Sequence, residues 1–124
     1  MSNPVLFKSF TAAAAIAAFR IVKLSAAETV TPAAAVGDSL LGVNSDVAPA
    51  LGERCDVVLA GIAFVEAGAA VALGALVTSD AVGRGVTAAP AVGVNNRIIG
   101  VAVDAAVAAG DVIRVLLQQG TTQG

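Results

Sequence analysis

Residues 71–87 read VALGALVTSDAVGRGVT, and this stretch decides the fold because the chain contains a second copy of it. The other copy begins about 55 residues earlier, where Ile16–Lys23 aligns with Val71–Thr78 and Val30-Thr31 aligns with Val86-Thr87. Each copy is an apolar run with a strand-like pattern that leads into a polar turn. The chain is therefore expected to use one small β unit twice.

A second alignment, at a constant offset of 58, extends the repeat toward the end of each copy. Two glycines and two acids fall in register, and Ile113, Val115 and Leu117 take the inward positions of Cys55, Val57 and Leu59. The pattern predicts an all-β fold, a small closed barrel or β-tulip-like sandwich built from two pseudo-repeats. The matched residues are Leu41, Gly42, Val43, Asp46, Gly52, Glu53, Val57, Val58 and Leu59, against Ile99, Gly100, Val101, Asp104, Gly110, Asp111, Val115, Leu116 and Leu117.

The predicted domain organisation is an extended N-terminal arm, residues 1–7, followed by one β domain, residues 8–124, with pseudo-repeats at about 8–61 and 62–120. The apolar runs 54–60 and 62–66 are expected either to pair or to form one bent strand. Thr11–Ala18 is predicted to be mostly non-helical, because the repeat aligns its second half with a glycine-containing segment, although alanine favours helix. Residues 118–124 are predicted to be a polar tail.

The composition indicates a protein with contact surfaces. Hydrophobic residues make up 57% of the chain, yet aromatic residues make up only 3%, and the net charge is −2. So few charged side chains leave much of the surface apolar, which is typical of interfaces. We therefore expect an oligomer or a protein that lies on a larger assembly.

Two apolar stretches raise the alternatives of a membrane-spanning helix and a signal peptide. The longest charge-free stretch, residues 67–79, is shorter than the roughly 20 apolar residues of a spanning helix. A signal peptide is an alternative, since Lys8 precedes the apolar run 10–19. Arg20 and Lys23, which follow the apolar run, argue against a signal peptide. The repeat also predicts that these residues form strands.

The sequence lacks several residues and motifs on which enzyme sites are commonly built. There is no histidine, which removes the commonest general base and transition-metal ligand. The single cysteine, Cys55, excludes an intramolecular disulfide, suits a reducing compartment, and is interpreted as a buried apolar residue. No phosphate-binding loop is found, and Gly83-Arg84-Gly85 is interpreted as a hairpin turn. Scattered basic residues predict no direct nucleic-acid binding, and we predict no enzyme activity and no cofactor.

The acids that recur in both copies are the one group of polar residues that could form a functional site. Asp46 with Glu53, and Asp104 with Asp111, are candidates for acid–base catalysis or a cation site. The favoured interpretation is that each acid marks a turn or strand start in its own copy. The arginines are expected to be surface or interface charges, at Arg54, Arg97 and Arg114. A biotinyl or lipoyl carrier is disfavoured, because Lys8 and Lys23 lie in no carrier motif.

Taken together, several motifs resemble the bacteriophage capsid cement, or decoration, family. The likeness covers nearly the whole chain and includes Ser2–Leu6, Lys8–Ala12, Arg20–Lys23, Gly52–Arg54, Asp56–Gly61, Gly74–Thr78, Asp80, Gly83, Arg97–Gly100 and Gly110-Asp111. The resemblance implies a non-enzymatic, head-stabilising structural protein of the virion with a compact β fold. It further implies a homotrimer, made in the host cytoplasm, that binds the outer capsid surface and clamps neighbouring subunits of the major capsid protein.

Within this interpretation, the N-terminal arm is the first candidate for the interface with the capsid or with a neighbouring protomer. Its candidate contact residues are Ser2, Asn3, Pro4, Val5 and Phe7. A different class of function stays open. A small β-barrel that binds a ligand or carbohydrate would need a concave pocket with convergent polar groups.

Overall fold

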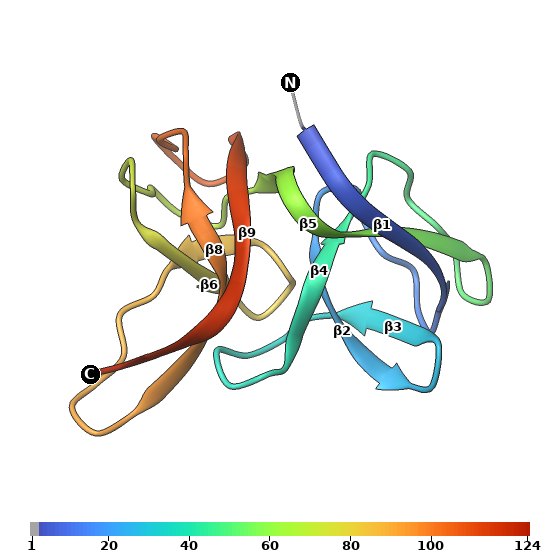
Figure 1. Cartoon of the computed structure of the whole chain (residues 1–124), viewed down its shortest axis with the longest axis horizontal. Coiled ribbons are helices and arrows are strands. Elements are labelled where there is room, and N and C mark those ends of the chain that lie inside the picture. Colours follow the sequence, from blue (N-terminus) through green and yellow to red (C-terminus); the bar gives the residue numbers. More distant parts are fainter. Residues whose placement is uncertain (1–2) are drawn as a thin grey trace.

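The computed structural model describes residues 3–124, and within this range every regular element is a β-strand (Figure 1). The predicted all-β fold is confirmed, and Thr11–Ala18 is indeed free of helix. No helix that could cross a membrane is found among these residues. The strands are β1 (Asn3–Ala12), β2 (Ile21–Ala26), β3 (Thr29–Pro32), β4 (Leu40–Asn44), β5 (Arg54–Glu66), β6 (Leu76–Ser79), β7 (Gly85–Thr87), β8 (Asn95–Ala102) and β9 (Val112–Gln123).

The first five strands close into a small barrel in the order β1-β3-β2-β4-β5, because β1 also pairs with β5. β1 lies parallel to β3, where Ala12 pairs with Val30, and antiparallel to β5, where Phe10 pairs with Cys55. Small and β-branched side chains fill the interior: Ala12, Ile16, Val22, Val30, Cys55 and Val57. The expected closed barrel is therefore present in the first half of the chain.

The other strands repeat this arrangement in the second half. They follow the order β5-β9-β8-β6-β7, and a parallel bridge from Ala67 to Gly85 joins the end of β5 to β7. That bridge is the counterpart of the pairing between Ala12 and Val30. Outward from the central β5–β9 pair, the orders β5-β4-β2-β3 and β9-β8-β6-β7 match. Figure 1 shows the two halves as neighbouring lobes, β1–β4 in one and β6, β8 and β9 in the other.

Strand β5 belongs to both lobes. Its first part pairs with β1, and its second part pairs with β9, from Gly61 opposite Leu117 to Glu66 opposite Val112. The strand turns at Gly61, whose φ of 95° is a conformation that glycine adopts without a steric penalty. Of the two arrangements considered for residues 54–66, one bent strand is therefore correct.

A second, larger apolar cluster contains residues from both halves of the chain. It holds the expected inward residues Ile113, Val115 and Leu117. Ile21 and Val43, from the outer side of the first barrel, are fully buried in the same cluster. This cluster therefore contains side chains from both halves of the chain, and it is separate from the smaller cluster inside the first barrel.

The repeat extends to backbone hydrogen bonds. The amide of Ala12 donates to the carbonyl of Glu53 at 2.9 Å, and the amide of Ala67 donates to the carbonyl of Asp111 at 2.7 Å. The glycines that precede these two acids, Gly52 and Gly110, have φ values of 83° and 96°. Equivalent sequence positions therefore build equivalent turns.

Two details of the sequence interpretation are wrong. Val30 corresponds to Gly85 in the structure, not to Val86, and a Cβ at Gly85 would crowd the methyl groups of Val65 and Val77. The predicted polar tail is a strand for most of its length, because β9 continues to Gln123 and pairs with β8. Strand pairing uses backbone hydrogen bonds, which do not require apolar side chains. The polar residues at the end of β9 therefore form a strand although their sequence has no apolar pattern that predicts one.

Candidate interaction surface

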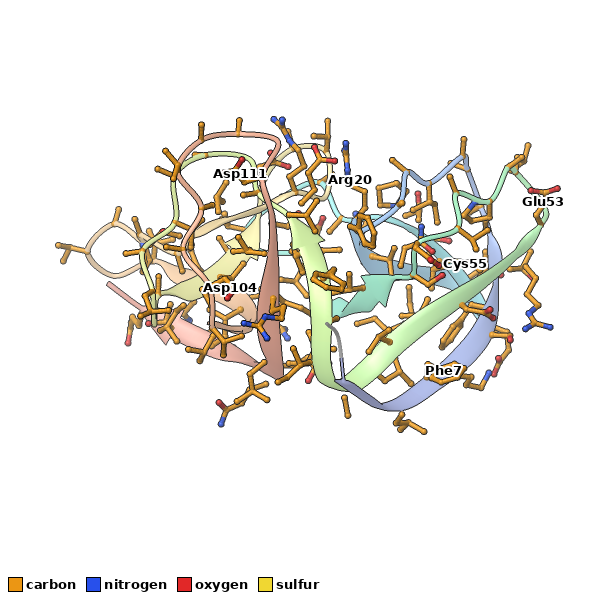
Figure 2. The ribbon with its side chains drawn as sticks, turned by 90° about the horizontal axis from the view of Figure 1, so that it is seen from above. Phe7, Arg20, Glu53, Cys55, Asp104 and Asp111 are labelled. Carbon is orange, nitrogen blue, oxygen red and sulfur yellow. The ribbon has the colours of Figure 1, made fainter. Side chains whose placement is uncertain are left out.

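Phe7 is the most exposed aromatic side chain in this aromatic-poor chain. It lies on β1 opposite Val58 of β5 and is 60% exposed. Figure 2 shows it where β1 runs beside β5. Exposure of a large aromatic ring costs hydrophobic free energy unless a partner covers it.

Phe7 lines the rim of a surface pocket of about 410 Å³. Phe19 and Phe64 also line it, so three of the four phenylalanines of the chain meet here. The rings of Phe19 and Phe64 pack edge to face, with centroids 6.0 Å apart. Aromatic side chains gathered in a surface pocket are typical of protein contact sites.

Two carboxylates give the pocket an acidic side. Asp56 accepts hydrogen bonds from Arg54 Nε at 3.0 Å and from Ser9 Oγ at 2.9 Å. The bond from Arg54, and then that from Ser9, hold the pKa of Asp56 below its ordinary value of 3.8. Asp46 lies on the same pocket and is exposed, and no described residue forms a hydrogen bond or ion pair with its carboxylate.

The other repeated acids serve local structure. Glu53 Oε1 accepts a hydrogen bond from the amide of Ala50 at 2.7 Å, and Asp111 Oδ2 accepts one from the amide of Val107 at 2.8 Å. Figure 2 places Asp104 and Asp111 apart from each other. Within residues 3–124, no group of three potential metal ligands is found. The interpretation of Glu53 and Asp111 as turn residues agrees with this geometry.

The arginines differ in their surroundings. Arg114 holds Asp104 through two side-chain hydrogen bonds, of 2.8 and 2.9 Å. These bonds, and the bond from the Arg114 amide, lower the pKa of Asp104 from 3.8 to about 2. Arg54 forms the pair with Asp56, whereas Arg97 is exposed and has no acidic partner among the described residues. All three are surface charges, as predicted.

Cys55 has the environment expected of an apolar core residue. It is 1% exposed, and its thiol donates to Asn44 Oδ1 at 3.3 Å. Burial, and then the charge of Asp56, raises the pKa of the thiol from 9.0 to about 11. The reactive thiolate is thereby disfavoured.

The predicted contact residues fall at the start of β1. Ser2 lies outside the described residues. Asn3 and Pro4 pair with Ile62 and Gly61 of β5, and β1 continues to Ala12, although its register against β5 shifts between Pro4 and Phe7. The expected boundary between arm and domain thus falls inside a strand. The sequence interpretation missed Phe19, Phe64 and Asp46 as neighbours of Phe7, although the scarcity of aromatic residues was an available signal.

Exposed apolar side chains also occur on loops away from the pocket. The largest exposed fractions on loops are 96% at Val92, 84% at Val107, 71% at Leu51 and 70% at Leu73. Such residues at loop ends are free to contact other proteins.

The protein thus consists of two lobes of paired strands with an aromatic pocket at its surface. Comparison with known proteins gives its class: the family model described as "Phage cement protein" matches residues 3–117, so the chain belongs to the phage cement protein family. It is therefore a structural phage head protein, and the family resemblance found in the sequence is confirmed.

A solved structure shares the fold. The head fiber gp8.5 N base of bacteriophage phi29 aligns with a TM-score of 0.71 and 16% sequence identity, over 96% of this chain and 98% of that chain. A search of curated proteins gave no match. The family agrees with the predicted class of function, a structural protein associated with the virion.

Proposed function

We propose that this protein binds the outer surface of the phage capsid as a homotrimer and cements neighbouring subunits of the major capsid protein. The observation that carries this proposal is the exposed Phe7 on an aromatic pocket, in a member of the phage cement protein family. The protein is made in the host cytoplasm and joins the completed shell. The N-terminal segment, residues 2–7, supplies contacts to the capsid or to a neighbouring protomer.

Many weak contacts are sufficient for this role. A protein that binds the assembled shell, and not its separated subunits, stabilises the shell by mass action. A trimer holds three binding surfaces together, so the effective concentration of the second and third is high once the first is bound. The sparse charge and the apolar loop ends of this chain suit such contacts.

Reconstitution on capsids tests the proposal. Purified protein is added to expanded capsids that lack it, and co-sedimentation, electron cryomicroscopy and the temperature of capsid disruption are measured. We expect saturable binding at outer positions shared by several major capsid subunits, and a higher disruption temperature. Failure to bind expanded capsids would sink the proposal.

A second candidate is a ligand- or carbohydrate-binding module, and the pocket beside Phe7 favours it. Nuclear magnetic resonance titration with mono- and disaccharides distinguishes the two. Chemical-shift changes confined to the pocket residues would support this candidate, and their absence would remove it.

A further inference from the structure

Asp46 stands out in the charge distribution of the chain. Six ion pairs occur among residues 3–124, and they use six of the nine acids in the sequence. Glu53 and Asp111 accept hydrogen bonds from backbone amides of their own turns. Asp46 is the one acid left without a partner within the described range, and it lies on the aromatic pocket.

The acid that corresponds to Asp46 in the second half of the chain is bound by an arginine. At the offset of 58, Asp46 corresponds to Asp104, which is held by Arg114. The correspondence holds in the backbone, since the amide of Ser45 donates to the carbonyl of Asp56 and the amide of Val103 donates to that of Arg114. The first half thus has Asp56 where the second half has its arginine. An arginine has to come from outside to complete the same pair at Asp46.

Arg97 is the matching cation. Of the seven basic residues, the other six form the ion pairs above, and Arg97 alone lacks an acidic partner among residues 3–124. Its backbone amide donates to the carbonyl of Val36 at 2.7 Å, and Val94 lies three residues before it in the chain. Both valine side chains are exposed. An arginine beside exposed valines complements a carboxylate beside exposed phenylalanine, in charge and in polarity.

We propose that the aromatic pocket, whose lining includes Phe7, Asp46 and Phe64, receives Arg97 of a second copy of this chain. The inference rests on the homotrimer of the proposed function and names its contact. Because the two surfaces differ, the contact is head-to-tail, and three protomers close a ring in which each gives one Arg97 and one Asp46. The apolar neighbours of Arg97 then cover Phe7, and the phenylalanine rings face the bound guanidinium.

A charge-reversal experiment tests this contact. The variants are Asp46→Arg, Arg97→Asp and the double variant, each in the full chain, with the oligomeric state measured by sedimentation velocity over a range of protein concentrations. In either single variant, two like charges would face each other across the contact. We therefore expect the dissociation constant of the trimer to rise by about tenfold or more. The double variant restores opposite charges and is expected to recover the trimer.

Ser25→Arg is the control, because it adds a positive charge at an exposed position that does not line the pocket. We expect it to leave the trimer intact. Circular dichroism melting confirms that all four variants are folded, and both substituted side chains of the test pair are exposed, so the fold should tolerate them.

The outcomes separate this inference from the proposed function. Single variants that remain trimeric, or a double variant that stays dissociated, would overturn the contact. A trimeric Asp46→Arg variant that no longer binds capsids would also overturn it, because the pocket would then face the capsid. A monomeric wild-type protein that still binds capsids would leave the cement function standing and remove both the trimer and this contact.

Discussion

Gly42 and Gly100 occupy the same position in the two halves of the molecule, and each lies against a backbone carbonyl. A Cβ at Gly42 would overlap the carbonyl oxygen of Val58, and a Cβ at Gly100 would overlap that of Leu116. The two carbonyls are themselves related by the offset of 58. The close approach of backbone to backbone is therefore built into the repeated unit.

Alanine at either of these glycines should destabilise the fold. Backbone atoms cannot move aside as a side chain can, so we expect Gly42→Ala and Gly100→Ala each to lower the free energy of unfolding by about 1–3 kcal/mol or more. Chemical denaturation measures the change. Gly37→Ala is the control, because a Cβ there meets nothing within 4 Å, and its unfolding free energy should stay close to that of the wild type.

Asn44 stabilises the first barrel through a buried hydrogen-bond set that the second half lacks. Its Nδ2 donates to the carbonyls of Ala17 and Val47, both at 2.9 Å, while the corresponding residue in the second half is Ala102. Loss of these bonds in Asn44→Ala should cost about 1–3 kcal/mol in unfolding free energy. Asn95→Ala, at an exposed position, is the matched control. Equal stability of the two variants would show that the bonds contribute nothing.

The sequence was sufficient for the plan of the fold because the repeat is carried by residues with strict physical roles. Gly42 and Gly100 tolerate no side chain, and Gly52 and Gly110 need a positive φ. Such positions stay in register in both copies, and their alignment predicts two β units.

The candidate surface was less predictable, because it depends on distances across the chain. Phe7, Phe19 and Phe64 are far apart in sequence and meet only because β5 bends at Gly61 and serves both lobes. Alanine and valine recur so often that they also shifted the alignment at Val30, which belongs with Gly85. Neither effect leaves a local sequence signal.

The ion pair between Asp104 and Arg114 should make stability depend on pH in the acid range. The pKa of Asp104 is lowered from 3.8 to about 2 in the folded state, so the pair stabilises the fold fully above about pH 4. This contribution is lost as the pH falls from there through 2. We expect the wild type to be more stable than Asp104→Asn at pH 6, with the difference shrinking below about pH 4 and vanishing below pH 2. In an Arg114→Gln background the same substitution should show a smaller pH dependence, because the side-chain bonds of Arg114 are lost while the bond from the backbone amide of residue 114 remains.

Cys55 should resist thiol reagents for as long as the protein is folded. A thiol whose pKa is about 11 instead of 9.0 has roughly a hundredfold less thiolate at pH 8, and burial blocks access as well. We expect Ellman's reagent to react at least about a hundredfold more slowly with folded protein than with protein in guanidinium chloride. Fast labelling under native conditions would contradict the burial of this side chain.

Phe7→Ala should weaken assembly without weakening the fold. The ring is 60% exposed in the single chain, so its removal should change the unfolding free energy of the monomer little. If a partner covers the ring, its loss costs about 2 kcal/mol, or roughly thirtyfold in affinity. Sedimentation velocity measures the loss of affinity between protomers, and co-sedimentation with capsids measures the loss of affinity for the shell. Leu24→Ala, which removes a similarly exposed apolar side chain from β2, should leave both unchanged. If Phe7→Ala and Leu24→Ala had equal affinities in both measurements, Phe7 would not be part of the interface.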